Sequence, residues 1–143
     1  MRLKKLFLVL ITGLFMLPAA AQTSWQPLAE ADPGVVVSRQ TAVRETSGSR
    51  KEVVLLRFEN ISDQTLRITW HANLYYDGNC RTCGKPEYTH TFVLAPGQSR
   101  TGQANSNRLN TDGLRVFSRF LNGRQTAELS DLDILLTNVQ VVN

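Results

Sequence analysis

The sequence predicts an all-β protein whose main domain is an antiparallel β-sandwich of about seven strands. Two observations predict this fold class: apolar residues recur at every second position through most of the chain, and turn-forming residues separate these segments at regular intervals. Beyond the first 21 residues we find neither a helical periodicity nor an internal repeat. Antiparallel strands with this pattern place one face in a core and the other in water.

The first 21 residues predict a cleavable signal peptide. Three basic residues lie within the first five positions, an apolar run covers 6–17, and three alanines at 19–21 provide a cleavage site. An uncleaved membrane anchor is the alternative, but the apolar run is shorter than the about 20 residues that span a bilayer. We therefore expect an exported protein, either periplasmic or secreted, with no transmembrane segment after signal removal.

The mature chain is close to neutral. The full sequence has 16 basic and 12 acidic residues, and three of the basic ones belong to the predicted signal. A balance this even gives no electrostatic argument for a nucleic-acid partner. The remaining length suits one domain, which we divide into an N-terminal lead-in over 22–34 and the β-sandwich domain over 35–143.

Strands are predicted in the first half of this domain at 35–43, 52–60 and 66–76. The last has the clearest alternation, with Leu66, Ile68 and Trp70 on the inward row. The link at 60–64 contains Asn, Ser and Asp, whose side chains bond their own backbone in turns. The sequence therefore predicts that strands 52–60 and 66–76 form a hairpin.

The second half of the domain supplies the remaining strands. We expect strands at 88–94 and 99–103, separated by the Pro-Gly turn at 95–98, and then a polar loop over 103–113. A strand at 114–121 precedes Asn122-Gly123, which is a strong hairpin signal between two strands. The segment 132–142 supplies one or two closing strands.

Part of this pattern resembles a known family. The run VVLLRFENISDQTLRITW at 53–70 looks like the second and third strands of immunoglobulin-like modules in exported bacterial proteins, and Trp70 resembles their core tryptophan. The segment LAPGQS at 94–99 is similar to a turn in such modules. The resemblance implies an immunoglobulin-like β-sandwich, although both cysteines follow the tryptophan instead of bridging the sheets. It implies a fold and not a function.

The loop DGNCRTCGKP at 77–86 contains both cysteines, Cys80 and Cys83. In an exported chain a disulfide between them is the simplest interpretation. A redox centre would need a helix N-terminus beside the first cysteine, and zinc would need two further ligands, for which His71 and His90 are the histidines present. We therefore expect a disulfide, no bound metal and no cofactor.

No catalytic constellation is found, so we do not predict an enzyme. The sequence has no Gly-x-Ser-x-Gly elbow, and no carboxyl group lies in an apolar context that would raise its pKa. Asp131 and Asp133 share one face of a strand near Glu128, which permits a calcium site but is more typical of a solvated acidic face.

One strand face has the composition of a partner surface. Arg115, Phe117 and Arg119 share one face of the strand at 114–121, and interfaces are enriched in arginine and aromatic residues. Tyr75, beside the cysteine loop, is a further candidate contact. The alternative is that the lead-in, through Trp25, covers Phe117.

We thus predict a non-catalytic exported binding or accessory module whose partner is a protein or a cell-envelope component. The alternative is a metal-binding or thiol-redox protein that uses the Cys80-x-x-Cys83 loop.

Overall fold

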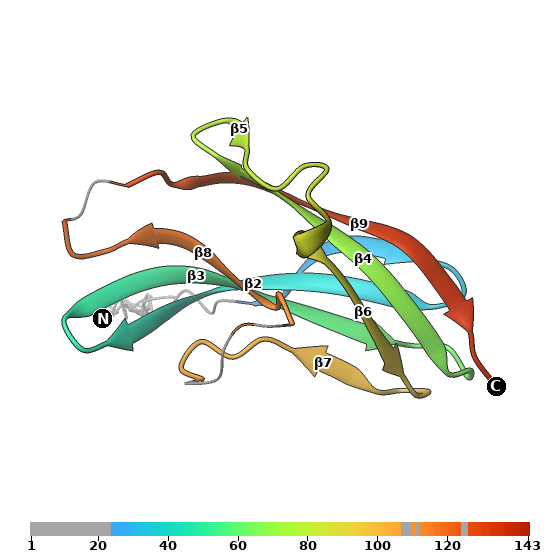
Figure 1. Ribbon diagram of the computed structural model, residues 1–143. Coiled ribbons are helices and arrows are strands. Elements are labelled where there is room, and N and C mark those ends of the chain that lie inside the picture. The colour runs from blue at the N-terminus through green and yellow to red at the C-terminus, as the bar shows by residue number, and fades with distance from the viewer. Residues whose placement is uncertain (1–23, 107–109, 111, 124–125) are drawn as a thin grey trace, which may run out of the picture.

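The computed structural model describes residues 24–106, 110, 112–123 and 126–143, and the predicted signal peptide, 1–21, lies outside them. Within this part of the chain the protein is all-β, as the sequence predicts, and contains no α-helix. Its nine described strands form two antiparallel sheets, sheet A and sheet B (Figure 1). No helix in the described ranges has the length and apolar character needed to cross a membrane.

Sheet A is built around a long hairpin and is strongly curled (Figure 1). Its strands are β1 (Gln26–Ala31), β2 (Val35–Thr46), β3 (Ser49–Asn60), β7 (Ser99–Thr101) and β8 (Arg115–Phe120). All 12 residues of β2 pair with the 12 residues of β3 in one unbroken register. β1 pairs with the free side of β2, whereas β7 and β8 pair with different halves of β3.

Sheet B is organised around β4. Its strands are β4 (Leu66–Tyr76), the two-residue β5 (Asn79–Cys80), β6 (Thr89–Leu94) and β9 (Leu129–Val141). β9 pairs along the whole of one side of β4, and β6 and β5 pair with separate parts of the other side. A single 3₁₀ turn, η1 (Pro86–Tyr88), connects the cysteine loop to β6.

Part of the expected lead-in is a strand. β1 lies within 22–34 and forms the outer edge of sheet A, with a register shift between Pro27 and Ala29. Proline is tolerated there because an edge strand leaves one row of backbone groups without a ladder partner. β1 leads into β2 through a tight turn that contains the cis peptide bond between Asp32 and Pro33.

The two hairpins predicted around β4 and β8 are wrong, because in each case the consecutive strands belong to different sheets. The link 61–65 carries the chain from β3 in sheet A to β4 in sheet B. The Asn60 side chain anchors this crossover, since its Nδ2 donates to the carbonyl oxygens of Gln64 at 2.7 Å and Leu94 at 3.0 Å. The segment after Asn122 likewise runs from β8 to β9 in the other sheet.

β7 and β8 both pair with β3, and the segment between these two strands leaves the sheet and returns to it. The Gly102 amide donates to the Leu56 carbonyl at 2.9 Å, and the Leu56 amide donates to the Leu114 carbonyl at 2.9 Å. Gly102 therefore lies directly against Leu114, where a side-chain Cβ would overlap the Leu114 carbonyl oxygen. The polar loop that the sequence predicts begins and ends at this junction.

Side chains of both sheets form one hydrophobic core. Its centre is the fully buried pair Phe58 and Trp70, whose ring centroids are 4.7 Å apart, with Phe92 edge-on to Phe58 at 5.2 Å. The inward row predicted for β4 is confirmed, because Leu66, Ile68 and Trp70 have no exposed surface. Burying such side chains contributes about 1.5–3 kcal/mol each, so this shared core holds the two sheets together.

Candidate functional site

The cysteine loop fills a gap beside β4. β6 begins with Thr89 opposite His71 and β5 ends with Cys80 opposite Tyr75, so in the described chain no strand pairs with residues 72–74 of β4 on that side. The buried Thr82 takes that place: its hydroxyl donates to the Ala72 carbonyl at 2.6 Å and accepts from the Leu74 amide at 2.8 Å. The Arg81 amide bonds the Leu74 carbonyl at 2.8 Å. The loop thus satisfies the backbone of β4 where the sheet does not.

Cys80 and Cys83 lie at disulfide distance, as predicted, at the base of this loop. The Cys83 sulfur lies 3.8 Å from the hydroxyl of Tyr75, which is on the outer face of β4. The bond closes a ring with a sequence separation of three, so its effect on the unfolded chain is small and its main effect is to hold Thr82 in place.

The structure does not bring together the four residues of the metal alternative, Cys80, Cys83, His71 and His90. His71 and His90 lie on opposite faces of sheet B, because Trp70 pairs with His90 and His71 with Thr89. The buried His71 ring donates from Nε2 to the Thr82 carbonyl at 3.1 Å, and its Nδ1 is hydrogen-bonded to the Thr89 hydroxyl at 2.8 Å. Both ring nitrogens of His71 are therefore occupied. The alternation in the strand predicted at 66–76 places His71 on the solvent-exposed face, opposite Trp70. That prediction is wrong, because the cysteine loop folds back over the His71 ring.

The predicted partner residues Tyr75, Arg115, Phe117 and Arg119 lie on two different sheets, Tyr75 on β4 and the other three on β8. The Arg115 guanidinium donates to the carbonyls of Gln103 and Ser106, each at 3.1 Å, and so holds the polar loop. The ring of Phe117 stacks on Tyr76 at 6.4 Å, whereas Trp25 lies over the Arg57 guanidinium at 4.6 Å. In the described residues, Trp25 thus contacts a different strand from the one proposed in the alternative.

A hollow near β8 contains two groups with shifted pKa values. It has a volume of about 280 Å³ and includes Tyr76, Tyr88 and His90 among its lining residues. Burial raises the pKa of Tyr76 above its ordinary value of 10.0, with a smaller contribution from Tyr88, and the hydroxyl donates to the Phe117 carbonyl at 2.6 Å. Burial lowers the pKa of His90 below 6.5, with smaller opposing effects of Asp112, which raises it, and His71, which lowers it. At neutral pH His90 is therefore an uncharged imidazole.

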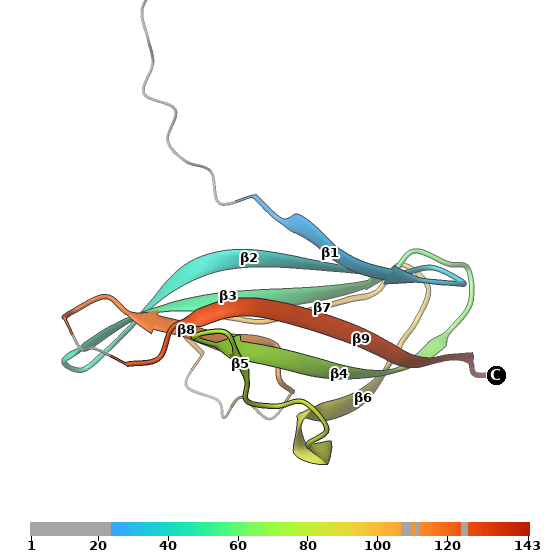
Figure 2. The same ribbon diagram turned by 90° about the horizontal axis from the view of Figure 1, so that it is seen from above.

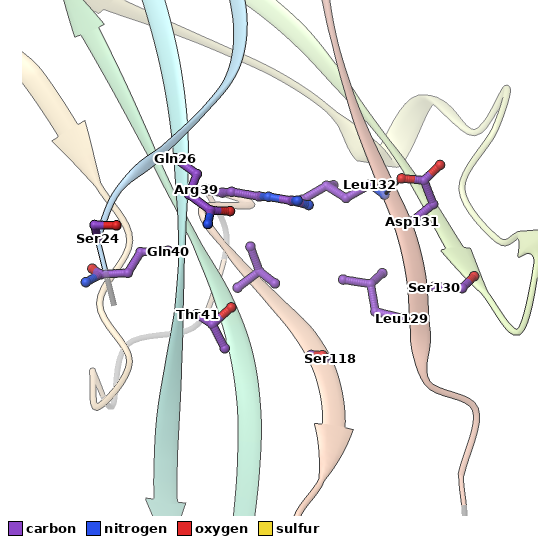
Figure 3. Close-up of a pocket in the computed structure, with 11 residues that line it drawn as sticks. Ser24, Gln26, Arg39, Gln40, Thr41, Ser118, Leu129, Ser130, Asp131 and Leu132 are labelled. Carbon is purple, nitrogen blue, oxygen red and sulfur yellow. Dashed lines mark hydrogen bonds between the residues drawn. The ribbon is translucent and has the colours of Figure 1, made fainter. Parts of the chain in front are cut away.

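A polar hollow lies between the sheets, next to the part of the core that contains Val54 and Leu132. This interlayer cleft has a volume of about 370 Å³, within the range of small-ligand sites. Residues of β2, β3 and β8 in sheet A form one wall and residues of β9 in sheet B the other (Figure 3). Hydroxyl and amide side chains dominate the lining, including Ser24, Gln26, Thr41, Ser118 and Ser130.

Arg39 projects into the interlayer cleft from an inward position of β2. It shares the inward row of the strand with the buried Val35 and Val37, and it pairs with Leu56, which has no exposed surface. Figure 3 shows its side chain extending from β2 toward Leu132 and Asp131 on β9. The interior of the protein thus changes along β2 from apolar to cationic.

Arg39 as a residue is half-buried, and no ion pair or hydrogen bond joins its guanidinium to any other described residue. Asp131, at the rim of the cleft, lies on the outer face of β9, and its carboxylate accepts from the Leu132 amide at 2.8 Å. Glu52, on the same inward surface of sheet A, has partners for its charge. Its carboxylate accepts from the Ser118 hydroxyl at 3.0 Å and forms an ion pair with Arg119 at 3.3 Å. Guanidinium groups form strong hydrogen bonds with anions, so an arginine that lines a polar cleft and has no partner among the described residues is suited to binding an anion.

Sequence reasoning missed this cleft. The only signal was that the inward row of the predicted strand 35–43 reads Val35, Val37 and then Arg39. That interruption becomes informative once the register shows which face is inward. Comparison of the chain with known protein families, curated proteins and solved structures finds no match.

Proposed function

We propose that this protein is an exported, non-catalytic binding module with an immunoglobulin-like β-sandwich fold. Its ligand occupies the interlayer cleft and places an anionic group, a carboxylate or an oxyanion of similar size, on Arg39. The fold proposal is supported by two antiparallel sheets that share one core containing Trp70, and the export proposal by the signal-like residues 1–21. The partner expected from the sequence, a protein or a cell-envelope component, fits a ligand with carboxylate or phosphate groups.

The guanidinium of Arg39, which has no partner among the described residues, carries this proposal. An anion that reaches this half-exposed guanidinium forms charge-assisted hydrogen bonds with it, which are stronger than hydrogen bonds between neutral groups. The planar guanidinium suits a carboxylate or phosphate, because two parallel N–H groups can bond two oxygens. The hydroxyl and amide groups around it supply further donors and acceptors for the rest of the ligand.

The first experiment measures the melting temperature in acetate, galacturonate, phosphate and sulfate against chloride at the same ionic strength. A ligand that binds only the folded state raises the melting temperature. We expect at least one of these anions to do so in the wild type, and Arg39→Gln to abolish the increase. Arg67→Gln, on the exposed outer face of β4, is the matched control and should respond as the wild type does.

The same variants test whether Arg39 has a structural role instead. Without added anion, Arg39→Gln should melt at the wild-type temperature or above it, because the substitution removes an unpaired, partly buried charge. If no anion stabilises the wild type, or if Arg39→Gln responds as strongly as Arg67→Gln, the cleft does not bind anions through Arg39.

A further inference from the structure

β9 has one side without a pairing strand. In the described part of the chain it pairs with β4 only, so it forms an edge of sheet B. β1 packs beside the second half of β9, where Leu28, Leu136 and Val139 all contact the core. β1 begins opposite Arg39 of β2. It therefore lies beside the second half of β9 and leaves the first half of β9 without a neighbouring strand of sheet A (Figure 2). In the described part of the chain, the half of β9 that β1 leaves uncovered is the half that borders the interlayer cleft.

Two irregularities delimit a regular segment on this edge. The register of β9 on β4 shifts between Tyr75 and Tyr76 and again between Thr69 and Trp70. Between these shifts, residues 131–136 pair without interruption, from Asp131 opposite Tyr75 to Leu136 opposite Trp70. Bulges protect edge strands from pairing with other chains, so the stretch between them is where a strand can be added.

The side chains of this segment, residues 131–136, alternate in character. Leu132 and Ile134 are buried in the core, whereas Asp131, Asp133 and Leu135 are exposed on the outer face of sheet B. A strand added beside this segment would place every second side chain next to the two aspartates. Its other side chains would point between the sheets, into the cleft that contains Arg39. Opposite charges stabilise neighbouring strands.

We propose that residues 131–136 of β9 accept an extended segment of a partner protein as an additional strand of sheet B. The segment alternates basic side chains, which face Asp131 and Asp133, with an inward acidic side chain, which binds Arg39. This inference rests on the proposed function, because it identifies the anionic ligand as a carboxylate of a polypeptide. A second copy of this chain fits less well, since pairing two β9 edges would gather four aspartates along one seam.

The test uses the synthetic peptide Thr-Lys-Val-Lys-Glu-Lys-Val-Thr, in which lysines alternate with an inward-facing glutamate. We expect it to shift the backbone amide NMR signals of residues 131–136 and the side-chain signal of Arg39, and to slow hydrogen exchange of amides in that segment. Two control peptides should not bind: one with alternate backbone nitrogens methylated, which blocks strand pairing, and one with lysine and glutamate exchanged.

Protein variants separate the two charge contacts. Asp133→Lys should weaken binding of the peptide about two- to fivefold, the size of one cross-strand charge pair, and Arg39→Gln about tenfold or more. Asp63→Lys, in the exposed crossover between β3 and β4, is the matched control and should bind as the wild type does.

The outcomes distinguish the two proposals. Equal binding of the methylated peptide, or shifts elsewhere than on β9, would overturn strand addition. If the peptide fails while simple anions still bind through Arg39, strand addition is wrong and the proposed function stands. If neither binds, both are wrong. A concentration-dependent dimer that protects the amides of 131–136 would identify a second copy as the occupant and would also overturn the proposal.

Discussion

Replacing Thr82 by valine should destabilise the protein, although valine has the same shape and is more hydrophobic. The Thr82 hydroxyl is the partner of two buried backbone groups of β4, the Ala72 carbonyl at 2.6 Å and the Leu74 amide at 2.8 Å. Valine leaves both without a partner, and each buried group left unsatisfied costs about 1–3 kcal/mol. We expect a total loss of about 2–4 kcal/mol in the free energy of unfolding, because the two groups share one donor–acceptor oxygen.

The assay is thermal or urea unfolding of Thr82→Val, Thr82→Ser and the wild type. For a domain of this size about 1 kcal/mol corresponds to about 4 °C, so Thr82→Val should lower the melting temperature by about 8–16 °C. Thr82→Ser keeps the hydroxyl and loses one buried methyl group, at a cost of about 1 kcal/mol. Thr91→Val is the surface control, since its hydroxyl bonds only that of Thr69 at 2.9 Å in the hydrogen bonds described.

The order of stability of the wild type, Thr82→Ser and Thr82→Val shows whether the hydroxyl or the apolar surface of residue 82 matters more. If burial of apolar surface dominates at residue 82, valine will be as stable as the wild type and serine will be the worse substitution. That result would refute the conclusion that Thr82 replaces a missing strand beside β4.

Three further predictions concern the junction of β7 and β8 and its surroundings. Gly102→Ala should lower the free energy of unfolding by about 3 kcal/mol or more, because the new Cβ would overlap the Leu114 carbonyl. Gly123→Ala should lower it by about 1 kcal/mol, because only its φ of 80° opposes a side chain, and urea unfolding measures both values. Lowering the pH through 6.5 should destabilise the wild type more than His90→Gln. The pKa of His90 is lowered in the folded state, so the unfolded state binds the proton more readily, and the difference between the two proteins should level off below the folded-state pKa. Equal pH dependence of the two proteins in urea titrations would contradict this. Arg115→Gln should speed amide exchange in residues 103–106, where Arg115 holds two carbonyls, whereas Arg119→Gln should leave that exchange unchanged.

The sequence predicts which face of each strand is buried better than it predicts which strands pair with each other. Alternation in 66–76 places Leu66, Ile68 and Trp70 inward, and all three are fully buried. The same alternation does not say which strand lies beside β4, because it would be equally clear in a hairpin and in a crossover. Asn60 shows the difficulty: it has the chemistry of a turn residue, yet its side chain bonds Leu94, which is distant in sequence.

The candidate site follows the same rule. The disulfide between Cys80 and Cys83 is predictable because the two residues are close in sequence and the signal-like N-terminus predicts an oxidising compartment. Thr82 and Arg39 owe their roles to partners that the sequence does not identify, namely a gap beside β4 and the opposing strand β9. An inward arginine among valines is a usable signal once the strand register is known.

The most direct test of the account observes the guanidinium of Arg39 itself. In the protein labelled with ¹⁵N-arginine, the Nε–Hε signal of Arg39, assigned with Arg39→Gln, should exchange rapidly with water and should shift on addition of acetate or phosphate. A protected signal that does not respond to either anion would mean that Arg39 already has an internal partner, and the interlayer cleft would then have no anion site.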